Sequence, residues 1–251
     1  FVLHRRGEQA QCHYCGLIKI TPTRCSVCRG DYLRLQGYGT QRVAEVLLAS
    51  FPEAIVDRID RDIAARRGAV EAVLHKFEKH ETDILVGTQM IAKGHDFPKV
   101  TLVGVIDADV GLGLPDFRSA ERTFALLTQV AGRAGRADLP GEVLLQTHNP
   151  KHYAIEFAQN QDYDAFFDRE MEFRRTMGYP PHDAMVNVLF RGKVEDEVAK
   201  NARNIARRLK VTLHEGVRGP SPSPLSKVRD EFRYQVVVRG KRGAIRESVH
   251  E

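Results

Sequence analysis

The sequence predicts an α/β protein whose central part is a parallel sheet covered by helices on both faces. Three runs of strand length, at 83–86, 100–106 and 142–146, are largely apolar instead of alternating with polar residues. Strands that are buried on both faces have this composition. Segments with apolar residues at helical spacing separate the runs. At 251 residues, 42% of them hydrophobic, the chain is long enough for one large domain or two ordinary ones.

Local patterns define the elements of this central part in chain order. A helix is expected from Thr40, a suitable N-cap, to Phe51, because apolar residues recur there at helical spacing. The breaker that begins at Gly178 and includes two consecutive prolines ends the last helix. Between these points we expect a strand at 54–60, the three strands named above, and helices at 64–79, 119–133, 152–160 and 163–177.

The remainder of the chain predicts a small α+β domain of the split-βαβ kind. It comprises a strand at 185–190, a helix at 195–213, a loop rich in Pro and Ser at 219–225 and a strand at 233–238. The polar end of the sequence shows no further element. We therefore expect three parts: a small module at 1–36, an α/β domain at 37–180 and an α+β domain at 181–251.

The net charge and the first residues of the chain indicate which class of protein it belongs to. The formal net charge of +5 at pH 7 is mild evidence for a polyanionic partner. The sequence has no apolar run of membrane-spanning length, and its first residues lack the order of a secretory signal. We expect a cytoplasmic protein that does not bind membranes. Because the chain begins at Phe1, inside a strand-like segment, it reads as a fragment cut at both ends.

All four cysteines lie within the first 28 residues, where Cys12 and Cys15 form one C-x2-C pair and Cys25 and Cys28 form another. Each such loop can direct two thiolates at one tetrahedral cation, so the two loops predict a structural Zn²⁺ site. Two disulfides or four buried thiols are the alternative.

A second constellation is GTQMIAKGHDFPKV at 87–100, directly after a predicted strand. The carboxyl end of a parallel strand is where ligands of this architecture bind, and Thr88 and Gln89 can donate hydrogen bonds to phosphate oxygens. Gly94 and Asp96 form a second polar turn. Ordinary turn chemistry is the alternative interpretation of both pieces. Asp107 and Asp109, at the end of the next strand, could line a ligand cleft, but a strand-end aspartate is more often a simple turn former.

The third constellation is QVAGRAGR at 129–136, at the end of a core-facing helix. Gln129, Arg133 and Arg136 stand at i, i+4 and i+7, a spacing that aligns side chains along one stripe of a helix. A basic helix end that complements the macrodipole is the alternative.

In combination, the second and third constellations resemble motifs V and VI of superfamily 2 helicases. The pattern Q-x2-G-R-x2-R of motif VI matches at Gln129, Gly132, Arg133 and Arg136. The segments CHYCG, CSVC, GTQRVAEVLLASFPEA, DILVGTQMIAKGHDFPKVTLVGVIDAD and LPDFRSAERTFALLTQVAGRAGR together resemble the bacterial primosomal PriA family of DNA helicases. This resemblance covers nearly the whole chain and is least specific in the last seventy residues. It implies a partial zinc-binding module at 1–36, a RecA-like helicase C-terminal lobe at 37–180 and a truncated C-terminal α+β domain at 181–251.

The resemblance assigns roles to the matched positions. It implies that Gln129, Arg133 and Arg136 reach the γ-phosphate of ATP held by another RecA-like lobe, and that Asp96 lies near the ribose. Gly94 and Gly132 belong to the same implied nucleotide site. The backbone of the translocated strand is implied to lie against five residues: Gly39, Thr40, Gln41, Thr88 and Gln89.

The chain departs from the family pattern in two respects. It contains no G-x4-G-K-[ST] motif, so ATP and Mg²⁺ are expected to bind in the full-length parent, and this chain is expected to be inactive alone. The family carries eight cysteines that bind two zinc ions. Cys12 and Cys15 would belong to one site and Cys25 and Cys28 to the other, so one rebuilt site and two half-sites both stay open.

The function that the resemblance implies is that of the second motor lobe of an ATP-dependent 3′→5′ DNA helicase, acting in replication restart and primosome assembly at stalled forks. The implied partners are forked or single-stranded DNA, replication-restart proteins and single-stranded-DNA-binding protein. The alternative is a zinc-dependent module that docks nucleic acid or protein without motor activity. An RNA helicase is disfavoured by the cysteine module.

Overall fold

The computed structural model describes residues 2–4, 9–11, 18–20, 24, 29, 39–89, 91, 97, 99–114, 116–132 and 141–250. Its contacts divide the chain into two compact units. Unit 2 comprises Gln36–Leu112 and Ala120–Phe166, and unit 1 comprises Phe1–Leu35, Gly113–Ser119 and Phe167–Glu251.

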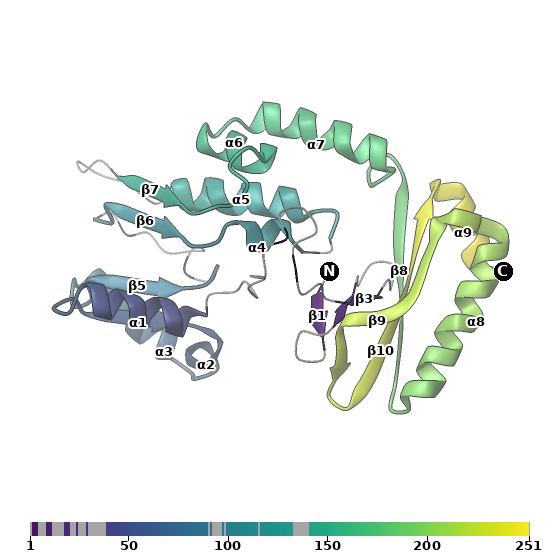
Figure 1. Cartoon of the computed structure of the whole chain (residues 1–251), viewed down its shortest axis with the longest axis horizontal. Helices are drawn as coiled ribbons and strands as arrows, with labels where there is room; N and C mark the ends of the chain where they lie inside the picture. Colours follow the sequence, from purple (N-terminus) through teal and green to yellow (C-terminus); the bar gives the residue numbers. More distant parts are fainter. Residues whose placement is uncertain are drawn as a thin grey trace. The chain divides into compact units, whose positions relative to one another are not determined.

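The strands of unit 2 pair in parallel, as the apolar runs predict. Strand β4 (Val56–Ile59) pairs with β5 (Ile84–Gly87), and β6 (Leu102–Val105) pairs with β7 (Glu142–Leu145). Among the described residues these strands form two two-stranded sheets and not the single sheet that the sequence predicts. Each pair is joined by its own helical crossover, the connection that parallel neighbours require (Figure 1).

The helices before and within the first crossover differ in part from the prediction. Helix α1 (Thr40–Ser50) packs on β4 and β5. The single helix predicted over 64–79 is wrong: the structure has a short α2 (Arg61–Ala64) and a separate α3 (Ala69–Glu78). Gly68, with φ +76°, precedes α3 in the left-handed conformation, so the chain cannot continue there as one helix.

The core of unit 2 is formed by helices beside the second strand pair. In it, the short helix α4 (Asp109–Leu112) packs with α5 (Ser119–Ala131) and α6 (Tyr153–Gln159). The ring of Phe124 on α5 stacks on the ring of Phe166, with the ring centroids 4.1 Å apart and the ring planes at 8° to one another. Phe166 lies in the first turn of α7 (Tyr163–Met177), whose limits are as predicted.

The C-terminal part of unit 1 is an antiparallel sheet covered by helices on one face. Strands β8 (Ala184–Gly192), β10 (Glu231–Gly240) and β9 (Val217–Val228) lie in the order β8–β10–β9. Helix α8 (Glu195–Leu213), a 3₁₀ turn at His214–Gly216 and helix α9 (Arg242–His250) complete it (Figure 1). Ala202, Ala206, Leu209 and Ile245 from the helices pack against Val236 and Val238 of the central strand.

Two expectations for this part are wrong. The loop predicted at 219–225 lies inside β9, because β9 is an edge strand, where a proline costs no ladder hydrogen bond that the sheet needs. Two irregularities in the β9–β10 register accommodate the prolines. The last segment, in which no element is expected, forms α9; its polar sequence hides the helix, whose buried anchor is Ile245.

Near the start of the chain, three short strands form an antiparallel sheet in the order β1–β2–β3, at Val2–His4, Gln9–Gln11 and Ile18–Ile20. None of the helices in the described ranges has the length and apolar composition that a membrane crossing requires.

Candidate functional site

The first predicted strand-contacting turn lies at the start of α1. Gly39 precedes the helix with an extended backbone, and its carbonyl accepts the first helical hydrogen bond, from the Val43 amide at 3.2 Å. Among the described residues no side chain caps this end, and no acidic residue lies in the first turn. Gly39 and Gln41 are exposed. The remaining first-turn amides and the positive end of the helix macrodipole therefore suit an anionic group such as a phosphate.

Asp60, at the end of β4, fixes the surroundings of this turn. Its Oδ2 accepts hydrogen bonds from Thr40 Oγ1 at 3.5 Å and lies 3.1 Å from Arg58 Nε. Its Oδ1 accepts from the Ile63 amide at 3.0 Å. One carboxylate thus joins the start of α1, strand β4 and the start of α2. Local sequence patterns do not reveal the role of Asp60, because its partners lie up to 20 residues away.

The second predicted strand-contacting pair, Thr88 and Gln89, follows the carboxyl end of β5, and both residues are exposed. The preceding Gly87 is required by packing, since a Cβ there would lie 2.9 Å from both the Ile59 carbonyl oxygen and the Ile91 Cγ2. The close approach of β4 and β5 therefore fixes the strand end that presents Thr88 and Gln89.

Gln129 lies near the end of α5 and is half-buried. The opposite side of this helix is anchored in the core by five buried residues: Ala120, Thr123, Phe124, Leu127 and Val130. Gly132 follows the helix, is exposed, and its amide donates to the Thr128 carbonyl at 3.1 Å. A rigid, core-anchored helix thus carries Gln129 and leads into the predicted arginines.

Several predicted site residues lie outside the described residues: Arg133, Arg136, Gly94, Asp96, Cys12, Cys15, Cys25 and Cys28. The convergence of the two guanidinium groups with Gln129 stays a prediction. So does the zinc site, although four thiolates in two C-x2-C loops are a donor set that fits tetrahedral Zn²⁺.

Two aspartates, Asp107 and Asp109, follow the carboxyl end of β6, and Asp109 also contacts residues that follow β7. Asp109 accepts hydrogen bonds from the His148 amide and from Asn149 Nδ2, both at 2.7 Å, and so ties the two strand ends together. Burial acts to raise the pKa of Asp109, but these hydrogen bonds outweigh it and hold the pKa below its ordinary value. Asp107 is 9% exposed with φ +54°, and neither of its carboxylate oxygens has a hydrogen-bond partner among the described residues.

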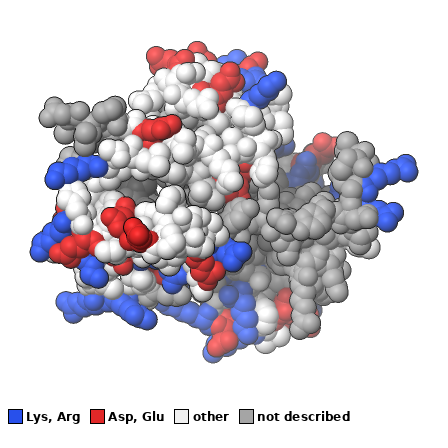
Figure 2. Space-filling view, turned by 60° about the vertical axis from the view of Figure 1, so that its left-hand side comes forward, with Lys and Arg blue, Asp and Glu red and all other residues white. Residues whose placement is uncertain are grey.

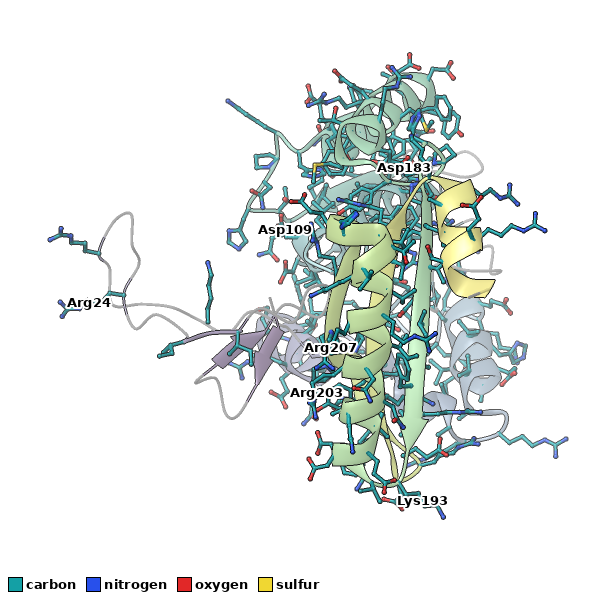
Figure 3. The ribbon with its side chains drawn as sticks, turned by 90° about the vertical axis from the view of Figure 1, so that its right-hand side faces the viewer. Arg24, Asp109, Asp183, Lys193, Arg203 and Arg207 are labelled. Atoms are coloured by element: carbon teal, nitrogen blue, oxygen red, sulfur yellow. The ribbon has the colours of Figure 1, made fainter. Side chains whose placement is uncertain are left out.

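A basic stripe on α8 is a feature that the sequence analysis missed. Lys200, Arg203, Arg207 and Lys210 stand at i, i+3, i+7 and i+10, and all four are exposed. Arg203 and Arg207 lie one turn apart along the same side of the helix (Figure 3). In the portion of the chain that the structure describes, none of the four forms an ion pair. The spacing of these four residues is visible in the sequence, but the apolar face of the same helix dominates its pattern.

The charge of the chain is concentrated in its C-terminal part. Residues 181–251 contain 15 Lys and Arg against 9 Asp and Glu, which more than accounts for the net charge of +5. On the face shown in Figure 2, by contrast, Lys and Arg are interspersed with Asp and Glu. The basic stripe of α8 is therefore the feature of the described surface that best suits a polyanion.

Two family models match the chain. The model for the helicase conserved C-terminal domain matches residues 39–138, and the model for the primosomal protein N C-terminal domain matches residues 175–251. The first range contains α1, the strands β4, β5 and β6, and the whole QVAGRAGR segment. The α/β unit is thus a helicase lobe.

Curated relatives agree with these models. The chain is 46% identical to the replication restart protein PriA of Bacillus subtilis over 95% of the chain and 30% of that protein. It is 40% identical to that of Synechocystis over 91% and 28%, and 41% identical to that of Treponema pallidum over 94% and 36%. The chain spans about a third of the length of these relatives. It belongs to the PriA family of replication restart proteins.

Proposed function

We propose that this chain is the second motor lobe, with the C-terminal domain, of an ATP-dependent 3′→5′ DNA helicase that acts at stalled forks. The observation that carries the proposal is the construction of α5. Its core-anchored side holds the helix rigidly, while Gln129 and the segment that follows belong to the matched helicase domain.

The proposed roles follow from what each group can do chemically. Arg133 and Arg136 stabilise the charge that develops on the transferring γ-phosphoryl group, because a guanidinium is permanently charged and presents a planar fork of donors. Gln129 holds the same phosphate or its attacking water. Gly94, Asp96 and Gly132 contact the nucleotide. ATP and Mg²⁺ bind to a P-loop lobe of the parent, so this chain alone does not hydrolyse ATP.

The proposed track for the DNA strand begins at two exposed points of unit 2. Gly39, Thr40 and Gln41 offer a helix start without a capping side chain, and Thr88 and Gln89 offer donors at the end of β5. Contacts of this kind bind the sugar–phosphate backbone and carry no base specificity. Such contacts suit a motor that moves along any sequence.

The basic stripe of α8 is proposed to contact DNA phosphates as well. Replacing Arg203 and Arg207 with Ala should weaken binding of the chain to forked DNA. It should also reduce the slope of log K against log salt by about 0.9 for each phosphate that the variant no longer neutralises. A matched control replaces Lys76 and Lys79, two exposed cations at the carboxyl end of α3, with Ala. Fluorescence anisotropy across a salt series measures both slopes, and equal slopes for the two variants would contradict the assignment.

The four cysteines are proposed to hold structural Zn²⁺. The purified chain should contain zinc by elemental analysis, and a strong chelator should release it together with the structure of the amino-terminal module. Replacing Cys12 and Cys15 with Ser should lower the zinc content, since two of the four thiolates are then missing. A chain purified without chelators that contains no zinc would overturn this part of the proposal.

A further inference from the structure

Strand β4 carries an arginine at the edge of unit 2 where the two proposed contacts of the DNA strand lie. In the register of the parallel pair, Arg58 lies opposite Val86, and the next pair is Ile59 opposite Gly87. Thr88 follows Gly87 directly. The strands β4 and β5 therefore end at the same level, and the carboxyl edge of a parallel sheet is where ligands of this architecture bind.

The carboxylate of Asp60 connects Arg58 to the start of α1. Arg58 Nε lies 3.1 Å from Asp60 Oδ2, and the same oxygen accepts the hydrogen bond from Thr40 Oγ1. The guanidinium and the hydroxyl group therefore contact one and the same oxygen atom. Arg58 thus belongs to the edge that presents Thr40 on α1 and Thr88 after β5.

Asp60 is itself held in place, because it caps α2. Its Oδ1 accepts a hydrogen bond from the Ile63 amide at 3.0 Å, and its carbonyl accepts one from the Ala64 amide at 2.8 Å. These are the two bonds of an N-cap aspartate. An anchored carboxylate limits the rotamers of Arg58, so a ligand that binds the guanidinium costs little further side-chain entropy.

The guanidinium of Arg58 has donors left for a second acceptor. It carries five N–H groups in a planar fork. Within the ranges that the structure describes, Asp60 is its ion-pair partner, through Nε, and the Arg58 side chain is 29% exposed. A phosphate group is an acceptor that such a fork suits, because two parallel N–H groups can contact two of its oxygens.

The pair formed by Arg58 and Asp60 is better suited to binding than to stability alone. The two side chains are 29% and 14% exposed, so both lose much of their hydration on folding. The attraction between two such charges roughly offsets this loss. A phosphate on the free side of the fork would meet a guanidinium and not a bare carboxylate, because Arg58 already neutralises Asp60.

We infer that Arg58 is a further contact of the single-stranded DNA backbone at this edge, beside the start of α1 and the end of β5. The inference rests on the proposed function for the presence of the strand. It adds a cation to a track that is otherwise made of backbone amides, hydroxyls and amide side chains. Like those contacts, a guanidinium bound to phosphate carries no base specificity.

Binding of a short, labelled single-stranded oligonucleotide to the 251-residue chain tests this contact. The measurement uses an Arg203→Ala, Arg207→Ala chain, so that the proposed contact of α8 does not mask the effect. In that chain Arg58→Ala should weaken binding about tenfold, as expected for one hydrogen bond between charged groups. It should also reduce the slope of log K against log salt by about 0.7, the value for one phosphate of a single strand. Fluorescence anisotropy across a salt series measures both.

Lys79→Ala provides the matched control. Lys79 is exposed and lies after the end of α3 and before the start of β5, which places it toward the amino edge of the strands. Its removal changes the net charge by the same amount as Arg58→Ala and should leave the affinity and the slope unchanged. Equal slopes for Lys79→Ala and Arg58→Ala would show a general effect of net charge and overturn the inference.

Arg58→Lys separates the contact from a role in folding. It keeps the charge and an ion pair with Asp60, so the slope should be retained, but the affinity should fall about threefold because an ammonium lacks the planar fork. Urea denaturation measures the stability of both variants. If Arg58→Ala binds less only because less of the chain is folded, its slope will equal that of the parent and the inference fails.

The same titrations distinguish this inference from the proposed function. An unsubstituted chain that does not bind the oligonucleotide would count against the proposed track, and the assignment of Arg58 would fall with it. Binding that Arg58→Ala leaves unchanged would overturn the assignment of Arg58 alone, because the contacts at α1 and β5 would then suffice.

Discussion

Replacing Arg133 with Ala in a longer protein that contains both motor lobes is expected to lower DNA-stimulated ATP hydrolysis by at least ~10³-fold. Arginines that contact the transferring phosphoryl group contribute factors of ~10³ to 10⁵ in other nucleotidases, because they stabilise charge that exists only in the transition state. Arg136→Ala should have an effect of the same order. A coupled assay for released phosphate, run at saturating ATP and DNA, measures the loss.

The control for this experiment must separate catalysis from helix capping. Arg133→Lys keeps the charge but not the planar fork, so it should retain little activity if the bidentate geometry matters. Arg169→Ala, which removes an exposed guanidinium from α7, should leave ATP hydrolysis unchanged. If Arg133→Ala unfolds at a lower temperature in proportion to its lost activity, the arginine stabilises the helix end and the motor interpretation of the residue is wrong.

Replacing Phe124 with Ala is expected to cost about 3–5 kcal/mol of the free energy of unfolding, the usual range for a buried Phe. Phe124 is 5% exposed and stacks on Phe166, which is 4% exposed, so the substitution removes a ring pair and leaves a cavity between α5 and α7. Urea denaturation of the 251-residue chain, followed by circular dichroism, measures the change. Because the cavity lies under α5, the same variant should loosen the helix that carries Gln129.

Phe167, the neighbour of Phe166 on α7, provides the matched comparison. It is 47% exposed, so Phe167→Ala should cost well under about 1 kcal/mol. Phe124→Leu should lie between the two, because the aliphatic side chain refills part of the space. Equal losses for Phe124→Ala and Phe167→Ala would show that α5 is not anchored as the structure places it.

Elements with a strong apolar periodicity could be predicted closely. The limits of α7 and α8 agree with the sequence-based expectation to the residue, since an unbroken apolar stripe and clear end signals define each helix. In α8 the acidic first turn at Glu195–Glu197 also suits the positive end of the helix. A sequence pattern that suits both a loop and a strand could not be assigned without the tertiary structure. The prolines of β9 are typical of a loop, but an edge strand also tolerates them.

The candidate site also has a part that local sequence patterns predict and a part that they do not. Local motifs were enough to select Gln129, Thr88 and Thr40, because each lies beside a predicted element end. Contacts between residues that are distant in the chain were not predictable: Asp60 contacts Thr40 from 20 residues away, and Tyr179 contacts Phe117 from 62 residues away. Periodicity and capping rules describe neighbours along the chain, and these pairs are neighbours only in the fold.

The most direct test of the account is a crystal structure of the longer protein, with both lobes, bound to ADP, Mg²⁺ and an aluminium fluoride mimic of the γ-phosphate. We predict that the guanidinium of Arg133 or Arg136 lies within hydrogen-bonding distance of the fluoride ligands, with Gln129 beside it. Both guanidinium groups directed into solvent, away from the nucleotide, would contradict the assignment of this chain as the second motor lobe.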